Sequence, residues 1–198
     1  MAILGLLAFS NSSIYQKYYN EAYEIASAMT LDQKIGQTIQ ADFYSIASKN
    51  HTDLNLVTKH HFGSLLVGGD GCPDESGNMF IFKNEDEPKI VEIYANASLD
   101  KWQAFTSKFS NITEKVTTNS GKTYEISLLL ATDAVHNDQH VTGTILFPHN
   151  IGLSCSHNPD NFFNMGKWTA QNVKKSGFNY AFAPTVAVSH NPQWGRFY

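Results

Sequence analysis

Cysteine and charged residues are scarce in this sequence, and no run of apolar residues is long. The two cysteines, Cys72 and Cys155, form no metal or redox motif, so we expect two isolated thiols. Lys and Arg number 14 against 18 Asp and Glu, a net charge of −4, which leaves no basic surface for nucleic acid. No apolar stretch approaches the roughly 20 residues that span a bilayer. The sequence therefore argues against a nucleic-acid partner and against a membrane protein.

Apolar residues make up 42% of the 198 positions, which is typical of a globular protein with a real core. Charged residues are only 16%, below the roughly 25% of an average soluble protein, and uncharged polar residues take their place. Residues 1–13 resemble the apolar part of a signal peptide without its positive start, so a signal remnant, a first strand and an artefactual start all stay open. Four Asn-x-Ser/Thr triplets add mild support for a secreted or lysosomal/vacuolar protein; they begin at Asn11, Asn50, Asn96 and Asn111.

Two segments predict amphipathic helices, because tyrosines and apolar residues recur in them at helical spacing. They cover residues 15–29 and residues 99–109. Directly after the first segment, Thr30 and Gln33 have the spacing of a capping box, which predicts the start of a second, short helix.

The best-defined predicted helix lies near the end of the chain. Asn158 is its predicted N-cap, Pro159 suits the first helical position, and Gly177 stands just past the end. Lys174 and Lys175 fall in the last turn, where positive charge is favourable.

Four short apolar runs are predicted to be strands, over residues 37–41, 62–67, 126–131 and 180–188. They alternate with helices, which indicates a parallel sheet covered by helices. Four such strands are half of a (β/α)8 TIM-type barrel, which usually takes about 250 residues. The predicted fold class is therefore α/β, roughly the first half of such a barrel. Residues 14–198 form this partial domain, with an irregular insertion at about 74–97.

Asp133 is the strongest candidate for a binding residue, because it directly follows the predicted strand 126–131. In a parallel barrel the C-terminal strand ends face the ligand, so a carboxylate there points into the mouth of the site. Its two oxygens can accept hydrogen bonds from adjacent hydroxyl groups. The alternative is an N-cap for a following helix.

Arg196 follows the fourth predicted strand and should reach the same face, where its guanidinium can donate to a hydroxyl or hold a carboxylate. Trp194 is expected to pack this loop, although its ring could also support a ligand. His136 and His149 are expected to be hydrogen-bonded scaffold residues of the loops around the site.

Three segments match known metal-binding, nucleophile or dinucleotide-binding motifs only in part, so neither a metal nor a cofactor is predicted. Asp133, His136 and His140 have a spacing compatible with a metal but lack a helix that carries Glu. Residues 152–156 miss the last position of a nucleophile elbow. Residues 69–71 lack the third glycine of a dinucleotide-binding loop.

Six peptides, in order, resemble the N-terminal barrel domain of family 3 glycoside hydrolases, the β-glucosidase and exo-β-glucanase group. They are Met29-Thr30-Leu31-Asp32-Gln33-Lys34-Ile35-Gly36-Gln37, Phe62-Gly63-Ser64-Leu65-Leu66-Val67-Gly68-Gly69, Asp133-Ala134-Val135-His136, Phe147-Pro148-His149-Asn150, Tyr180-Ala181-Phe182-Ala183-Pro184 and Trp194-Gly195-Arg196. The resemblance covers roughly residues 15–198 apart from the insertion.

The resemblance implies a retaining β-D-glucosidase or exo-β-glucanase that releases terminal glucose from a β-glucoside or β-glucan oligosaccharide. It assigns Asp133 and Arg196 to the glycone in the first sugar subsite. The family's nucleophile and acid/base would lie beyond Tyr198, so no catalytic carboxyl is expected in this chain. The chain departs from the family pattern at two positions. Asn137 stands where many members have Gly, and Asn191, before Pro192, stands where the family has Asp. The alternative is a non-catalytic carbohydrate-binding paralogue.

Overall fold

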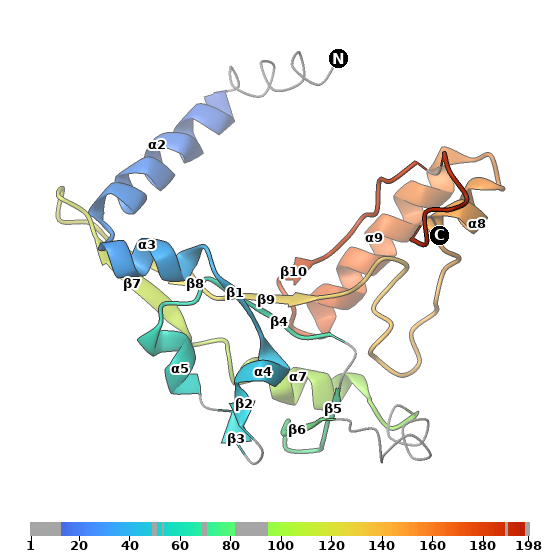
Figure 1. Cartoon of the computed structure of the whole chain (residues 1–198), viewed down its shortest axis with the longest axis horizontal. Coiled ribbons are helices and arrows are strands. Elements are labelled where there is room, and N and C mark those ends of the chain that lie inside the picture. The colour runs from blue at the N-terminus through green and yellow to red at the C-terminus, as the bar shows by residue number, and fades with distance from the viewer. Residues whose placement is uncertain are drawn as a thin grey trace.

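The computed structural model describes residues 13–48, 51–52, 54–68, 71–81, 95–188 and 190–196. Its centre is a four-stranded sheet in the order β1 (Gln40–Asp42), β4 (Ser64–Leu66), β9 (Leu129–Thr132) and β10 (Tyr180–Ala181) (Figure 1). All three pairings are parallel. The chain is thus a mixed α/β protein with a parallel sheet whose strands follow one another along the chain, as the sequence predicts.

The two faces of this sheet differ in burial. Leu65 and Leu130 are paired in register and are almost fully buried, at 0% and 3% exposure. Side chains alternate along a strand, so the neighbouring positions point to the opposite face. On that face Leu129 and Tyr180 are 44% and 42% exposed. Helices therefore cover one face, whereas the other is open to solvent at Leu129 and Tyr180 and closed at Ala131, which is 0% exposed.

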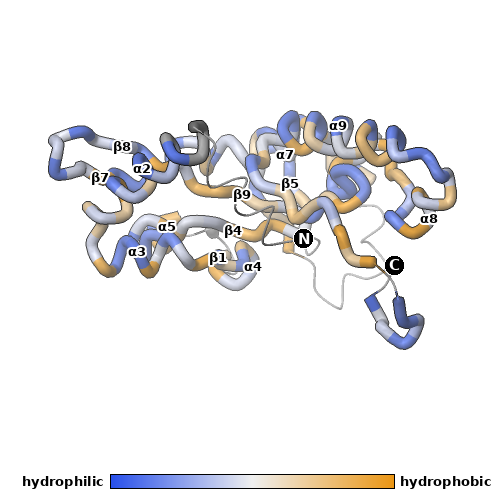
Figure 2. Tube along the Cα trace, turned by 90° about the horizontal axis from the view of Figure 1, so that it is seen from above, coloured by the Kyte–Doolittle hydropathy of each residue, from blue (hydrophilic) through white to orange (hydrophobic). Residues whose placement is uncertain are grey.

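Three helices lie between successive strands of the sheet, namely α5 (Leu54–Lys59), α7 (Leu99–Ser107) and α9 (Pro159–Lys175). Each contributes to one apolar cluster against the covered face, which includes Val57, Trp102, Phe105 and Val173. The rings of Trp102 and Phe105 meet edge to face with centroids 5.9 Å apart, a favoured aromatic arrangement. Figure 2 shows β4 and β9 as largely hydrophobic, whereas α9 alternates between hydrophilic and hydrophobic residues.

Two helices precede the sheet, α2 (Ser13–Ala28) and α3 (Leu31–Gln37), and α2 projects away from the rest of the fold (Figure 1). The predicted capping box is confirmed, because the Thr30 hydroxyl accepts from the Gln33 N–H and the Gln33 side chain accepts from the Thr30 N–H. The predicted first strand, 37–41, began too early. Thr38 is the C-cap of α3 and keeps a helical conformation, so β1 starts only at Gln40.

Three antiparallel hairpins are added to this frame. The first follows α4 (Phe43–Ile46) and pairs β2 (Ala47–Ser48) with β3 (His51–Thr52). The second pairs β5 (Gly71–Pro73) with β6 (Met79–Ile81). The third pairs β7 (Thr113–Thr117) with β8 (Thr123–Ser127).

These hairpins change two predictions. The insertion at 74–97, predicted to be irregular, begins within the β5–β6 hairpin, and its residues 82–94 lie outside the described part of the chain. The single strand predicted over 126–131 is divided between β8 and β9. Leu128 separates the two strands; its side chain is buried and its N–H donates to the carbonyl of Ile112 at 3.1 Å.

The C-terminal part contains α8 (Asn150–Ser154), which the sequence did not predict, and α9, whose predicted ends are confirmed. The Asn158 side chain accepts from the Asp160 N–H at 3.0 Å, and Gly177 has a φ of +90° just past the helix. Glycine adopts this left-handed conformation without a steric penalty.

The fourth predicted strand, 180–188, was too long, because β10 contains only Tyr180 and Ala181. Phe182 still donates to the carbonyl of Thr132 at 3.0 Å. Pro184 then has no N–H with which to continue the pairing. Val186 and Val188 are 83% and 70% exposed. The apolar side chains at the end of this run are therefore not buried by the described part of the chain.

Candidate functional site

Asp133 directly follows β9 and lies at the C-terminal edge of the sheet, as predicted. Its carboxylate is half-buried and lies beside the end of β4: a Cβ built on Gly68 would be 3.3 Å from Asp133 Oδ2. The helix-capping alternative for Asp133 is wrong, because the next helix begins only at Asn150. The Asp133 carboxylate therefore caps no helix.

Phe182 occupies the position next to Asp133 on the β10 side. Thr132 pairs with Ala181, so the following residues of the two strands, Asp133 and Phe182, share the same row. The Phe182 ring lies 5.2 Å from that of Tyr180, centroid to centroid. The strand register therefore places Phe182 in the row of Asp133, a neighbour that was not predicted from the sequence.

The structure brings His136 and His149 together, with ring centroids 4.4 Å apart and planes at 59°. The pKa of His136 is lowered, first by burial and then by the neighbouring His149. The main chain of His136 is anchored, because the Phe147 N–H donates to its carbonyl at 3.0 Å. His136 Nδ1, by contrast, is buried and finds no hydrogen-bond partner among the described residues.

Asn150 belongs to the same loop cluster and was not singled out from the sequence. It begins α8, and its Nδ2 donates to the carbonyl of Thr185 at 2.5 Å, which ties this helix to the segment after β10. Its Oδ1 is buried, and no residue in the described part of the chain donates to it. His136 Nδ1 and Asn150 Oδ1 are thus two of the buried polar atoms after β9 that find no hydrogen-bond partner among the described residues, together with Asp138 Oδ1 and His140 Nε2.

Arg196 and Trp194 lie on the exposed C-terminal segment. The Trp194 N–H donates to the carbonyl of Asn191 at 3.1 Å, which closes a local turn, and the Trp194 side chain is 45% exposed. Among the described residues, no ion pair or hydrogen bond joins Arg196 to Asp133. The structure therefore does not bring these two predicted binding residues into contact.

A buried polar cluster supports the loop that follows Asp133. Asn137 has a φ of +100°, and its side chain offsets this strain by donating to the carbonyl of Ile145 at 2.6 Å and accepting from Asn172 at 2.9 Å. Asp138 is fully buried, and its Oδ2 accepts from the Ser176 hydroxyl at 2.6 Å. Asp138 and Ser176 are far apart in sequence, so no local pattern could have revealed the pair.

A groove of about 480 Å³ adjoins these loops on the side of α9. Its walls are mostly apolar and come from residues 134–135, from α9 and from the segment after β10. Phe163, on this wall, is 73% exposed. The groove has few polar groups, so it offers few hydrogen-bond partners to a polyhydroxylated ligand.

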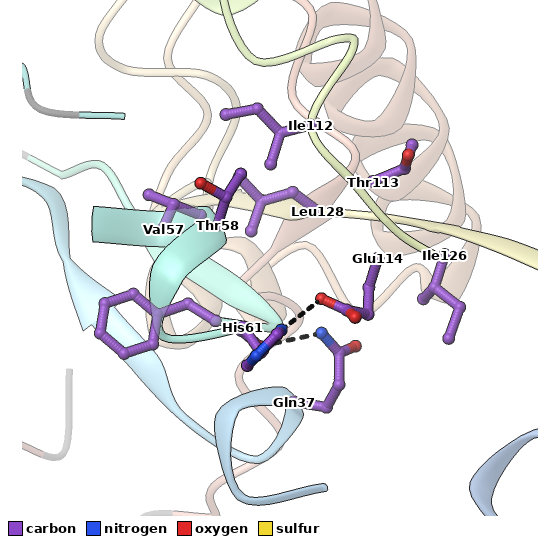
Figure 3. Close-up of a pocket in the computed structure, with 10 residues that line it drawn as sticks. Gln37, Val57, Thr58, His61, Ile112, Thr113, Glu114, Ile126 and Leu128 are labelled. Carbon is purple, nitrogen blue, oxygen red and sulfur yellow. Dashed lines mark hydrogen bonds and ion pairs between the residues drawn. The ribbon is translucent and has the colours of Figure 1, made fainter. Parts of the chain in front are cut away.

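A second polar cluster lies at the opposite, N-terminal end of the sheet (Figure 3). His61 Nδ1 is 2.8 Å from Glu114 Oε2, the Gln33 amide donates to Glu114 at 2.6 Å, and Gln37 donates to the His61 carbonyl at 3.0 Å. The cavity here is only about 10 Å³, enough for about one water molecule. This cluster ties the β7–β8 hairpin to α3 and is not a substrate site.

The remaining described side chains were compared with the requirements of a metal site. Within the described part of the chain, no group of three or more His, Cys, Asp or Glu residues is arranged to hold a metal ion. Cys72 and Cys155 are both free thiols, and burial raises the pKa of Cys72 to about 11. No helix among the described residues is long and apolar enough to cross a membrane.

Residues 30–198 match the family described as the glycosyl hydrolase family 3 N terminal domain. Among curated proteins, the chain is 25% identical over 175 residues to a lysosomal beta glucosidase of Dictyostelium discoideum, covering 88% of this chain and 19% of the relative. It is 38% identical over 72 residues to a periplasmic beta-glucosidase of Salmonella typhimurium, covering 36% of this chain and 9% of the relative.

A similar solved structure is the exo-1,3/1,4-beta-glucanase of a Pseudoalteromonas species, with a TM-score of 0.57 and 27% identity over 89% of this chain and 19% of that protein. A structure of its Q683A mutant matches equally well over 24% of its length. The chain thus spans 19% of the length of the Dictyostelium relative and of the Pseudoalteromonas glucanase. By its sequence and its parallel sheet, this chain belongs to glycosyl hydrolase family 3, and residues 30–198 correspond to the N-terminal domain of that family.

Proposed function

We propose that this chain forms the glucose-binding part of a retaining β-D-glucosidase or exo-β-glucanase, with a β-glucoside or β-glucan oligosaccharide as substrate. The observation that carries the proposal is the position of Asp133 at the C-terminal end of β9. Its carboxylate is half-buried, is not used to cap a helix, and lies between Gly68 and the position of Phe182.

The chemistry of this position suits a sugar. A carboxylate can accept hydrogen bonds from two adjacent hydroxyl groups, and Gly68 leaves room for the ring to approach because it has no side chain. The Phe182 ring offers an apolar surface beside the carboxylate. Hydrogen bonds that strengthen as charge develops on the sugar ring stabilise the transition state more than the ground state. Arg196 would complete the subsite if its exposed segment folds over the sheet when sugar binds.

The sheet supports a further part of the proposal, that β1, β4, β9 and β10 are half of an eight-stranded barrel. Leu129 and Tyr180 would then lie in the barrel interior, which is normally filled with side chains. The outer edges of β1 and β10 would pair with the remaining strands. Exposed apolar residues on the open face are difficult to explain if the sheet functions alone.

In this proposal both catalytic carboxyls come from outside these residues, because Asp133 is assigned to sugar binding. A retaining glycosidase needs two carboxyls about 5–5.5 Å apart. Asp42 also ends a strand, but it caps α4 by accepting from the Ser45 N–H at 2.9 Å. Asp138 is fully buried and bonded to Ser176. We therefore propose that the nucleophile and the acid/base belong to other parts of a longer enzyme, and that this chain alone releases no nitrophenol from an aryl β-glucoside.

The test is calorimetric titration of the purified chain with methyl β-D-glucopyranoside. We expect weak binding that the Asp133→Asn substitution abolishes and the control Asp160→Asn, at an exposed carboxylate of α9, leaves unchanged. Binding that survives in Asp133→Asn would refute the assignment of this carboxylate. The alternative of a non-catalytic carbohydrate-binding paralogue would be favoured by sugar binding in a full-length protein that hydrolyses no β-glucoside. A secreted or lysosomal location is part of the proposal, in keeping with the names of the lysosomal and periplasmic relatives.

A further inference from the structure

We propose that Asn111 is an N-glycosylation site, at which an oligosaccharide is attached at the end of the sheet opposite Asp133. Asn111 begins the triplet Asn111-Ile112-Thr113, one of the Asn-x-Ser/Thr triplets of this sequence. A glycan of this kind is bulky and hydrophilic, so its asparagine must lie on the surface. The inference rests on the secreted or lysosomal location in the proposed function, because N-glycans are attached in the secretory pathway.

Asn111 lies at the tip of a tight turn between α7 and β7. The Ile112 N–H donates to the carbonyl of Phe109 at 3.0 Å, so Ser110 and Asn111 are the two central residues of a β-turn. Phe109, on one side of the turn, is 5% exposed, and Ile112, on the other side, packs against the same apolar cluster. Ser110 and Asn111 are both exposed. The core thus holds both sides of the turn and leaves its tip in solvent.

The side-chain amide of Asn111 is free to react, because no hydrogen bond holds it within the described part of the chain. In the transfer, the amide nitrogen attacks the first carbon of an oligosaccharide that a lipid pyrophosphate carries. A carbon–nitrogen bond forms, and the bond from that carbon to the pyrophosphate oxygen breaks with its electron pair leaving on the pyrophosphate. One proton of the amide nitrogen passes to the pyrophosphate, so the transfer needs no oxidant or reductant.

The turn at Asn111 lies far from the proposed sugar subsite. The Leu128 N–H donates to the Ile112 carbonyl at 3.1 Å, and Leu128 directly precedes β9, whereas Asp133 directly follows it. At about 3.3 Å per residue, the strand places Asp133 roughly 16 Å from Leu128. A glycan on Asn111 therefore extends from the N-terminal end of the sheet and leaves the subsite open.

The triplet that begins at Asn96 is placed less favourably, although Asn96 is also exposed. Ala97, the next residue, is 1% exposed, and its carbonyl accepts from the Thr142 N–H at 2.9 Å. Thr142 belongs to the long loop that begins at Asp133, so a glycan on Asn96 would start beside the support of the sugar subsite. The remaining two triplets begin outside the described residues, at Asn11 and Asn50. Among the described triplets, Asn111 is thus the one whose glycan would not crowd the site.

The experiment produces the full chain in a eukaryotic cell behind a cleavable secretion leader. The chain, both secreted and retained in the cell, is treated with peptide-N-glycosidase in water labelled with ¹⁸O. This enzyme converts each asparagine that carries a glycan to a labelled aspartate, which a peptide mass map locates. We expect the label at Asn111 in the wild type and in Thr113→Ser, which keeps the triplet. Thr113→Ala keeps the asparagine but not the triplet, so the label should be lost completely. Asn119, which is exposed but outside any triplet, should stay unlabelled.

The proposal is overturned by a wild-type chain without label at Asn111, whichever other triplets carry it. Label at Asn111 that persists in Thr113→Ala would also contradict it, because the modification would then not follow the triplet. The affinity for methyl β-D-glucopyranoside is measured separately, on the glycosylated wild type and on Asn111→Gln, and should be the same in both. If neither chain binds the glucoside, the proposed function fails while a glycan found at Asn111 still supports this inference. If only Asn111→Gln binds it, the glycan obstructs the subsite, and its placement at the opposite end is refuted.

Discussion

The bond between Ser176 and Asp138 predicts a large effect from a small substitution. Ser176→Ala removes one hydroxyl and leaves the rest of the side chain in place. Both residues are fully buried, and the Ser176 hydroxyl donates to Asp138 Oδ2 at 2.6 Å. Asp138 Oδ1 already has no hydrogen-bond partner within the residues that the structure describes. After the substitution, neither carboxylate oxygen of a fully buried residue would have a side-chain donor.

The expected cost follows from the value of a hydrogen bond to a charged group, about 1.5–3 kcal/mol. For a domain of this size each kcal/mol lowers the Tm by about 2–4 °C, so Ser176→Ala should lower the Tm by roughly 3–12 °C. Asp138→Asn makes the acceptor neutral, and in that background Ser176→Ala should cost only about 0.5–1.5 kcal/mol. Ser107 is the matched control, because its exposed hydroxyl donates only to the Ala104 carbonyl of its own helix.

Thermal melts followed by circular dichroism provide the assay. The reasoning would be refuted if Ser176→Ala and its control Ser107→Ala both had the Tm of the wild type within error. Equal losses in the wild-type and Asp138→Asn backgrounds would also contradict it, because the cost would then not depend on the charge of Asp138.

Three further predictions follow from other parts of the fold. Gly177→Ala should lower the free energy of unfolding by about 1–3 kcal/mol, because Gly177 has a φ of +90° and an added Cβ would meet the Thr106 side chain. Gly143→Ala is the control: Gly143 has a φ of +89° but open space around it, so this substitution measures the cost of backbone strain without the clash. Cys155, which is exposed, should react with a thiol reagent in the native chain, whereas Cys72, buried and with a pKa of about 11, should react only on unfolding; equal rates would contradict the fold around β5. The isolated chain should associate in size-exclusion chromatography, because Leu129, Tyr180 and the outer strand edges are open; a sharp, stable monomer would argue against the half-barrel proposal.

The parts of the fold that the sequence predicts correctly depend on local signals. Thr30 with Gln33, and Asn158 with Pro159 and Gly177, mark helix ends through contacts within a few residues. The four strands of the sheet were located for a similar reason, as short apolar runs between helices. Their bounds were less accurate, because the end of a strand depends on its neighbours rather than on its own residues.

The missed features depend on contacts that are distant in sequence. The run 126–131 reads as one strand, yet it changes partner at Leu128, from the β7 hairpin to the parallel sheet. The pairs Asp138–Ser176 and His140–Trp102 each join segments 38 residues apart. The position of Asp133 at a strand end was predictable, whereas the support beneath it was not.

The most direct test of the central claim is the kinetic effect of Asp133→Ala in the active enzyme to which we propose this chain belongs. Loss of a charged acceptor in the sugar subsite should lower kcat/KM by a factor of about 10²–10⁴, or roughly 3–5 kcal/mol, without a matching loss in Tm. Arg196→Lys should be impaired less, since it keeps the charge and loses the planar fork. Asp160→Ala, at an exposed carboxylate, should retain wild-type kinetics. An Asp133→Ala enzyme with normal kcat/KM would contradict the account.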